Sequence, residues 1–546
     1  MPDRVAKPAS EFTPKLITIL REGYGLADLR ADVMAGLTVA IVALPLSMAI
    51  AIASGVGPER GLFTAIIGGF LVSALGGSRF QIGGPAGAFI VLVAACVTQI
   101  GFNGLILAAF LSGAMLIVLA LLRAGTYVRF IPYPVTLGFT AGIAVTIFCS
   151  QIKDLLGLSL PSGEPAAILP KLEALWAARV SITPAAAGIA LATVAMIVGI
   201  RRVAPHLPNL LIAVAVSAVA ATLLHLPVET IFSRFGELPR TPPAPALPDL
   251  SAGAVWAALP WAASFTLLGA IESLLSAVVA DGMSGRRHRP NAELLAQGVA
   301  NIGSALFGGI CVTGTIARTA TNVRAGSHGP VSGMLHAVFV LLFMMIAAPL
   351  AGYIPLASLA AVLAVVAWNM AEKEAIWQML RASRADTVVF LATFLLVVFR
   401  DLTEGIVVGF ALGGLVFIQR MSDSASVERA PNPTALAEST EEYIVYHLHG
   451  PFFFGAAARL GAALDQIVEQ QRAFVVDFTD VPFIDSSGAR SFELLAHKMA
   501  RKDETLYLIG ARPEVAKVLH KAGVTEAGAR LLPGIASVER DLHKRS

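Results

Sequence analysis

Charged residues are scarce in this chain. Asp, Glu, Lys and Arg make up 14% of its 546 residues and apolar residues make up 56%, whereas a soluble protein carries about a quarter charged residues. This balance excludes an ordinary soluble globular protein. The net charge is only +3, and the sequence has no block of basic residues, so we expect no nucleic-acid partner.

Cysteine is also rare. Cys96, Cys149 and Cys311 lie far apart, within or beside apolar segments. Their spacing offers neither a metal site nor a disulfide framework. The sequence shows no catalytic triad, metal cluster or phosphate-binding loop, so we expect a protein that is not an enzyme and needs no cofactor. We also expect no cleavable signal peptide, because the first apolar run is too long for one.

Long uncharged runs fill the chain from Val33 to Gln419. Each approaches the length of about 20 residues that crosses a bilayer. We predict fourteen spans, near residues 33–54, 61–77, 85–99, 104–122, 132–150, 182–200, 208–225, 262–280, 292–308, 315–323, 331–350, 354–371, 387–399 and 402–419. Fourteen spans divide into two repeats of seven, and a repeat with an odd number of spans is inverted in the membrane.

Basic residues mark one side of these predicted spans. They are found near Arg123, at Arg201 and Arg202, in the loop 285–289, between Lys373 and Arg384, and in the N-terminal segment 1–32. Positive loops stay in the cytoplasm. The pattern therefore predicts an integral protein of the plasma (inner) membrane with both termini cytoplasmic. The longer loops 151–181 and 226–261 would lie on the opposite side, and we assign no chemistry to them.

Two segments in different halves of the chain look alike. Residues 73–89 and 304–319 each contain a Ser-Ala-Leu start, a Gly-Gly pair, a short polar break and a Gly-rich restart. Such repeats indicate discontinuous helices that meet at a site near the membrane midplane. The positive ends of two half-helices favour an anion. The alternative is a chance likeness of small residues that membrane helices use for close packing.

Two charged residues lie away from the ends of the predicted spans. Glu272 is central in its span, and Ser276 shares its helix face. A carboxylate at this depth indicates a proton or cation site, although it could instead be a buried carboxyl that serves packing. Arg318 follows the second break, where it either adds a positive field to an anion site or extends along its stem to the cytoplasmic interface.

The composition changes after Arg420. Residues 421–437 are polar and predict a linker, and residues 438–546 alternate strand and helix patterns, as in a small α/β layer fold. Strand patterns are found at 443–448, 473–478 and 505–510, and helical patterns at 456–470, 487–502 and 513–522.

Several motifs resemble those of one family. The stretch 43–62, the break at 83–88 and the stretch 314–322 resemble the sulfate permease (SulP) family of anion transporters. The segment 483–489, Phe-Ile-Asp-Ser-Ser-Gly-Ala, resembles the centre of a STAS domain, the cytoplasmic module of these transporters. The resemblance covers residues 25–546. It implies the inverted-repeat fold of nucleobase permeases, in which a core domain rocks against a gate domain, usually within a homodimer.

The resemblance also implies a site. Its substrate-binding residues would be Leu46, Pro85, Ala86, Gly87, Glu272, Thr315, Ile316, Ala317 and Arg318, and its coupling-ion residues Glu272, Ser276 and Gly314. Many relatives have a polar residue in place of Leu46, and some have an aromatic residue or Thr in place of Ala86. These differences increase the expected role of backbone N–H groups at residues 86, 87, 316 and 317. Relatives carry sulfate, bicarbonate, chloride or dicarboxylates.

The STAS-like segment supports a second hypothesis. Ser487 matches the serine that is phosphorylated in soluble relatives, and Asp485 can cap the following helix; the plain alternative is a capped turn. We predict a secondary active anion transporter, coupled to a proton rather than sodium, that works as a symporter by alternating access. The alternatives are an uncoupled anion channel or exchanger and a membrane-anchored STAS signalling scaffold.

Overall fold

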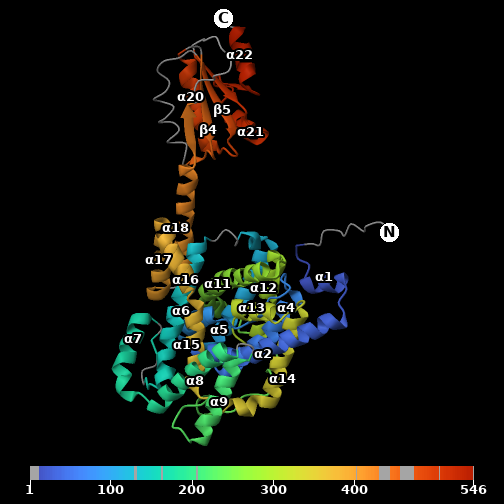
Figure 1. The fold of residues 1–546 in the computed structure, drawn as a ribbon, viewed down its shortest axis with the longest axis vertical. Helices are drawn as coiled ribbons and strands as arrows, with labels where there is room; N and C mark the ends of the chain where they lie inside the picture. Colours follow the sequence, from blue (N-terminus) through green and yellow to red (C-terminus); the bar gives the residue numbers. More distant parts are fainter. Residues whose placement is uncertain are drawn as a thin grey trace. The chain divides into compact units, whose positions relative to one another are not determined.

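The structure is a computed structural model. It describes residues 11–127, 132–160, 164–165, 167–204, 207–400, 402–429, 443–454, 473–502 and 504–544. The chain divides into two compact units, residues 1–410 and 411–546, which are considered separately (Figure 1).

The first unit is helical. Its elements, with short 3-10 and π turns labelled η, are α1 (Lys15–Glu22), α2 (Leu26–Ala53), α3 (Pro58–Phe63), η1 (Thr64–Gly68), α4 (Gly69–Leu75), β1 (Gly83–Gly84), η2 (Gly87–Phe89), α5 (Ile90–Leu121), η3 (Ala124–Thr126), α6 (Tyr133–Leu156), α7 (Ile168–Ala177), η5 (Ala178–Ser181), α8 (Pro184–Val203), α9 (Asn209–Leu223), α10 (Ile231–Phe235), α11 (Ala252–Ser284), α12 (Pro290–Leu306), β2 (Thr313–Gly314), α13 (Ile316–Arg324), α14 (Val331–Ala351), α15 (Leu356–Met370), α16 (Lys373–Ala382) and α17 (Arg384–Phe399). Helix α18 (Leu402–Asp423) crosses into the second unit.

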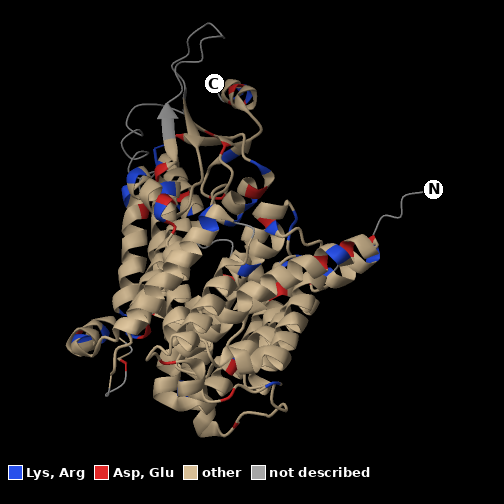
Figure 2. Cartoon of the chain, turned by 60° about the horizontal axis from the view of Figure 1, so that its bottom comes forward, with Lys and Arg blue, Asp and Glu red and all other residues tan. Residues whose placement is uncertain are grey.

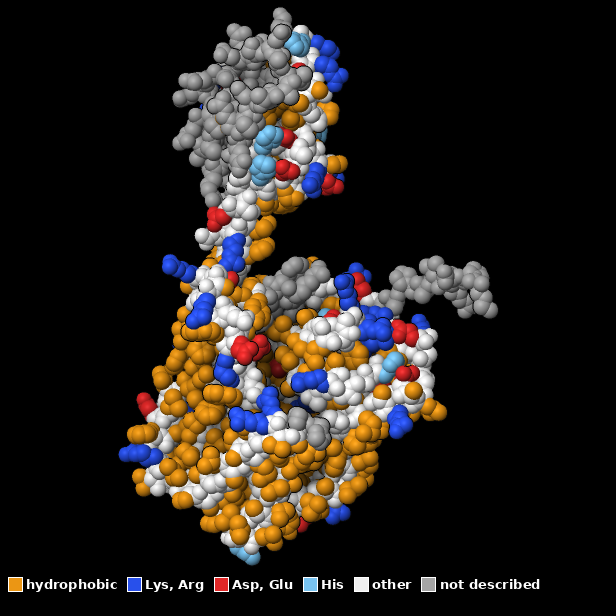
Figure 3. All heavy atoms as spheres, in the orientation of Figure 1, with side chains coloured by type: hydrophobic (Ala, Val, Ile, Leu, Met, Phe, Trp, Pro, Cys, Tyr) orange, Lys and Arg blue, Asp and Glu red, His pale blue; other side chains and the backbone are white. Residues whose placement is uncertain are grey.

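The surface of the first unit is apolar. Within the described ranges, eight helices are long and apolar enough to cross a membrane. Figure 2 shows Lys, Arg, Asp and Glu gathered toward the helix ends, and Figure 3 shows apolar side chains over much of the visible face. Water does not stabilise such a surface, whereas the hydrocarbon core of a bilayer does. The first unit is therefore a helical membrane unit.

Helices are found at the predicted segments, and eight of those in the described ranges are long and apolar enough to cross a membrane. Two segments differ from the prediction. The predicted spans 85–99 and 104–122 form the single element α5, which is interrupted at Gly101 by a left-handed φ of 72°. Helix α11 begins at Ala252 rather than near residue 262. The loop 151–181 also differs from the prediction, because it contains the helix α7.

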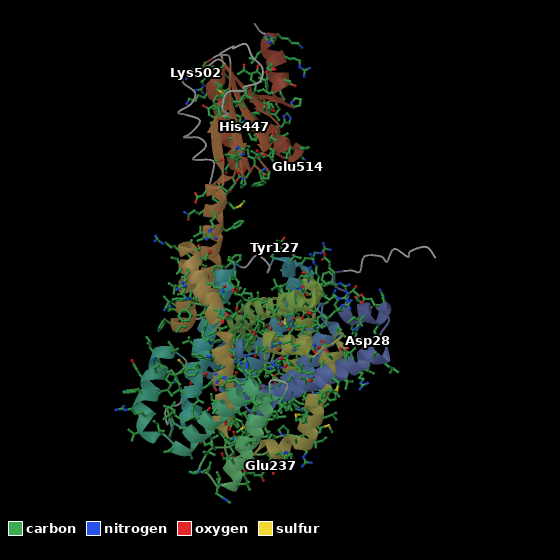
Figure 4. All side chains as sticks on the ribbon, in the orientation of Figure 1. Asp28, Tyr127, Glu237, His447, Lys502 and Glu514 are labelled. Atoms are coloured by element: carbon green, nitrogen blue, oxygen red, sulfur yellow. The ribbon has the colours of Figure 1, made fainter. Side chains whose placement is uncertain are left out.

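Two loops lie at opposite ends of the membrane unit. Tyr127 and Glu237 mark these ends in Figure 4. Tyr127 follows the loop near Arg123, and Glu237 lies within residues 226–261. The sequence predicts opposite sides for these two loops, and the structure places them so.

The second unit is built on a five-stranded sheet. Its strands are β3 (Ser426–Arg429), β4 (Tyr443–His449), β5 (Ala473–Asp480), β6 (Thr505–Ile509) and β7 (Arg530–Leu532), in that spatial order. Strands β3 and β4 are antiparallel and the other pairs are parallel. The described helices of this unit are α20 (Ser486–Ala500), α21 (Pro513–Lys521) and α22 (Ile535–His543).

Apolar residues cover both faces of this sheet, as parallel strands require. Phe478 packs with Phe492 of α20 on one face, and Val475 and Tyr507 pack with Val538 of α22 on the other. The predicted strands are present, while β3 and β7 were not predicted. The predicted linker 421–437 begins with the end of α18 and with β3, and the predicted helix 456–470 lies outside the described residues.

Candidate functional site

The two sequence breaks meet in a short β ladder. Strands β1 and β2 pair antiparallel, with Gly83 opposite Gly314 and Gly84 opposite Thr313. The Thr315 N–H donates to the Ile82 carbonyl at 3.0 Å, which extends the pairing. Backbone groups in a membrane need partners within the protein, and each break supplies them to the other.

Both helices that leave the ladder begin with unpaired N–H groups. Turn η2 starts at Gly87 and continues into α5, while α13 starts at Ile316. The amides of Ala86, Gly87, Ile316 and Ala317 have no hydrogen-bond partner among the described residues. Antiparallel strands lead away in opposite directions, so the N-terminal ends of two helices converge on one place. Such ends favour an anion.

Glycine is required in this ladder by close approach. A Cβ at Gly84 would lie 2.3 Å from Arg318 Nη1, and the φ of Gly84, 156°, disfavours other residues. A Cβ at Gly314 would lie 1.8 Å from Gln81 Nε2. At each of these two glycines, a side chain from the other break therefore occupies the space that a Cβ would need.

Arg318 is buried within the site. Its side chain is 1% exposed, and its Nη2 donates to the Pro85 carbonyl at 2.6 Å. Its Nε and Nη1 atoms have no partner in the described part of the chain. The alternative that this arginine extends to the cytoplasmic interface is wrong, because the short helix α13 points it back at the first break. Two charged donor positions remain available there.

Glu272 of α11 lies within electrostatic range of Arg318. Its Oε2 atom is buried and has no partner among the described residues. A buried carboxylate oxygen without a donor is costly, so a proton, a cation or water bound at this atom would lower that cost. Glu272 therefore lies near Arg318, the other charged residue that the sequence places within a predicted span.

Serines of α11 fasten the second break. Ser273 Oγ lies 2.7 Å from Thr313 Oγ1 and accepts from the Gly314 N–H at 3.2 Å. Ser276 Oγ donates to Thr319 Oγ1 at 3.1 Å. Ser276, expected as an ion ligand, is thus part of a hydrogen-bonded support. Ser273 was missed because it does not share the helix face of Glu272.

Helix α12 holds the segments that lead into both strands. Glu293 is 0% exposed, and its carboxylate accepts from Gly77 N, Ser78 N, Gln81 Nε2 and Gln297 Nε2 at 2.9–3.1 Å. Eight residues later, Asn301 accepts from Val312 N at 2.9 Å and donates to Val312 O at 2.8 Å. One helix therefore sets the positions of both breaks.

Apolar side chains are found near the first of these helix starts. Leu46 of α2, expected in the site, and Ala86 are both buried, at 7% and 3% exposure. A Cβ at Gly87 would meet Ile147 Cδ1 of α6 at 3.2 Å and Met370 Sδ of α15 at 3.8 Å. The site thus combines backbone donors and one arginine with apolar neighbours, so selection by side-chain hydrogen bonds from Leu46 or Ala86 is excluded.

In the second unit, Ser487 is exposed in the first turn of α20. Asp485 caps this helix by accepting from Gly488 N at 2.8 Å and also accepts from Phe454 N at 3.0 Å. The turn is an ordered N-cap, and its serine is accessible.

Comparisons with known proteins agree with this architecture. Residues 29–393 match the model of the sulfate permease family, and residues 434–535 match that of the STAS domain. The chain is 38% identical over 510 residues to the putative sulfate transporter YvdB of Bacillus subtilis, covering 92% of this chain and 95% of the relative. It is 30% identical over 521 residues to the bicarbonate transporter BicA of Synechocystis sp., covering 91% of each.

Solved structures show the same fold. Murine Solute Carrier 26 family member A9, an anion transporter in the inward-facing state, matches with a TM-score of 0.85 at 18% identity, over 98% of this chain and 95% of that one. The transmembrane domain of a cyanobacterial bicarbonate transporter BicA matches with a TM-score of 0.63 at 30% identity, over 70% and 98%.

Broken helices that converge inside an apolar helical unit define a membrane transport protein of the discontinuous-helix class. The sequence relationships make this assignment specific. The chain belongs to the sulfate permease family and carries a STAS domain, as its motifs predict.

Proposed function

We propose that this chain is a secondary active transporter of small anions of the sulfate, bicarbonate or dicarboxylate class. The observation that carries the proposal is the convergence of two helix N-termini, with four unpaired amides, on a ladder that also receives the buried Arg318. Curated relatives are named for sulfate and bicarbonate transport, which supports this substrate class.

The bound anion would be held by the amides of residues 86, 87, 316 and 317 and by the unpaired Nε and Nη1 of Arg318. Oxyanions suit such an arrangement, because each donor can meet a separate oxygen. Leu46 and the side chain of Ala86 then close the site with apolar surface instead of hydrogen bonds. Selection would depend on size and charge.

The contacts around the ladder support alternating access. Hydrogen bonds from α11 and α12 hold the ladder in place, whereas the neighbours of the space beside Gly87 are the apolar side chains of Ile147 and Met370. Apolar contacts have no fixed direction and permit sliding. We therefore place the moving boundary between the ladder and the helices α6 and α15.

For coupling, we favour a proton at Glu272, in symport with the anion. Sodium needs several oxygen ligands, and Ser276 already bonds to Thr319. Gly314, the other expected ligand, uses its N–H to reach Ser273.

The finer architecture follows from the same proposal. An antiparallel ladder that joins two equivalent breaks is the pairing that a fourteen-span, 7+7 inverted repeat produces. We also propose a homodimer in the plasma (inner) membrane with both termini cytoplasmic. Phosphorylation of Ser487 stays a prediction.

The central test is uptake of radiolabelled sulfate, bicarbonate and fumarate into proteoliposomes under imposed proton and sodium gradients. We expect accumulation of at least one anion with a proton gradient. Flux without accumulation would favour a channel or exchanger. A folded protein that neither binds nor carries any of these anions would favour the signalling scaffold.

Filling the space beside the donors should remove anion binding. Ala86→Phe and Thr315→Trp place bulk on the two helix starts, and we expect affinity to fall by more than about 100-fold. Equilibrium binding to purified protein measures this, with Ala192→Phe, at an exposed position of α8, as the matched control. If both filled variants keep wild-type affinity, the anion binds elsewhere.

Glu272→Gln should abolish accumulation driven by the gradient while anion counterflow continues. The amide keeps the size of the carboxyl but cannot carry a proton through the cycle. Uptake and counterflow on the same vesicles separate the two activities, and the exposed Glu374→Gln serves as control. Wild-type accumulation in Glu272→Gln would assign coupling to another group.

A further inference from the structure

A cavity lies beside the first half of α5. Its volume is about 200 Å³, the share of roughly seven waters in bulk liquid, which is enough for a small hydrated anion. It is lined by Val91, Leu92, Ala95, Thr146, Ala167, Ile168, Lys171, Val397, Val398, Phe399, Arg400 and Leu402. None of the residues assigned to the broken-helix site lines this cavity.

Lys171 of α7 gives the cavity a buried cation. The residue is 9% exposed, and its Nζ lies 2.8 Å from Glu164 Oε1. A buried ammonium needs a counter-charge, whereas the side chain of Glu164 is 26% exposed and can turn into water. The position of its carboxylate is therefore open to exchange with a dissolved anion. Arg400 also lines the cavity, but it is largely exposed and pairs with Glu404, so its field is screened.

The cavity lies close to the broken-helix site. Val91 and Leu92 follow Gly87 by four and five residues, about 6–8 Å along a helix. Thr146 lines the cavity, and the next residue, Ile147, lies against Gly87. Ile147 is 0% exposed. The apolar side chain of Ile147 therefore lies near the boundary between the cavity and the N-terminal end of the helix that follows Gly87.

The cavity also lies toward one face of the membrane unit. Helix α6 has 24 residues, which is long enough to cross a bilayer. Tyr127 precedes the N-terminal end of α6, and α7 follows its C-terminal end. Lys171 is therefore on the face opposite the one that Tyr127 marks.

We propose that Lys171 forms a second anion site, between the broken-helix site and the face that bears α7, where a small inorganic oxyanion replaces the carboxylate of Glu164. The site rests on the proposed transport function. An anion arriving from this face would exchange with Glu164 before Ile147 moves aside. Glu164 is a built-in competitor that keeps Lys171 paired when no anion is bound.

The test compares the two faces of oriented proteoliposomes, using the anion that the wild type carries. Lys171→Gln should raise the half-saturation concentration from the α7 face by about two- to fivefold, as expected for one partly solvated charge contact. The opposite face should not change. Glu164→Gln should lower the value for the α7 face, and Lys171→Arg should stay near wild type. Lys153→Gln, at the same end of α6, controls for general surface charge.

A binding measurement separates this site from the transport proposal. Sulfate and bicarbonate should stabilise Glu164→Gln against thermal unfolding more than the wild type, and adding Lys171→Gln should remove that gain. If this holds while the wild type transports nothing, the second site stands and the transport proposal fails. If transport occurs but Lys171→Gln changes both faces equally, or neither, the second site is refuted.

Discussion

Replacing Glu293 with alanine should lower the stability of the membrane unit by about 3–5 kcal/mol, the loss that follows from breaking a buried charged network. The carboxylate accepts four hydrogen bonds with no exposure to solvent. Alanine leaves the N–H groups of Gly77 and Ser78 and the amides of Gln81 and Gln297 without an acceptor. Gln81 then loses its anchor against Gly314, so anion binding should be lost as well.

Denaturant unfolding in detergent and equilibrium anion binding measure the two effects. Glu237→Ala, at the exposed glutamate marked in Figure 4, is the matched control and should stay within about 0.5 kcal/mol of wild type. Glu293→Gln keeps one acceptor oxygen and should fall between. Wild-type stability and binding in Glu293→Ala would mean that α12 does not position the breaks.

Arg318→Gln should weaken anion binding by about 10- to 100-fold, since hydrogen bonds to a charged group contribute about 1.5–3 kcal/mol. The guanidinium is buried and joins the two breaks through the Pro85 carbonyl, and its Nε and Nη1 have no partner among the residues that the structure describes. Its loss also leaves Glu272 without a nearby positive charge. Lysine should restore only part of the affinity, because it lacks the planar set of donors.

Calorimetric titration of purified variants with sulfate and bicarbonate measures this loss. Arg324→Gln is the matched control, because Arg324 is the exposed arginine at the other end of α13 and its Nε donates to the Ala320 carbonyl of the same helix. If Arg318→Gln binds like the wild type, the arginine is structural and the backbone amides alone hold the anion.

The sequence predicts much of this molecule because its signals are local. Long apolar runs predict the membrane helices, and Gly-rich breaks predict where α5 and α13 begin. Alternating strand and helix patterns predict β4, β5, β6 and α20. Strand β7 has only three residues, too few for a pattern, and β3 lies in a stretch whose polar composition predicts a linker.

The supports of the site depend on contacts between distant segments and were not predicted. Glu293 lies at the edge of the predicted span 292–308, and this position predicts a residue at the membrane interface. In the structure the residue is buried instead. Glu293, Gln297 and Asn301 are spaced by four, and this polar stripe in an apolar helix was the available signal. The contact of Arg318 with Pro85 depends on how two halves of the chain meet, which no local pattern records.

The ladder also affects how the chain is made. Arg318 and Pro85 are separated by 233 positions, so the first break is synthesised and inserted long before its partner exists. Until α13 enters the membrane, the backbone groups of Gly83 and Gly84 lack the pairing that they have in the finished protein. Closing such a long loop is slow relative to local helix formation. The anion site should therefore be among the last parts of the membrane unit to assemble. In a nascent chain that stops before α13, the backbone groups of the first break would lack their partners within the membrane.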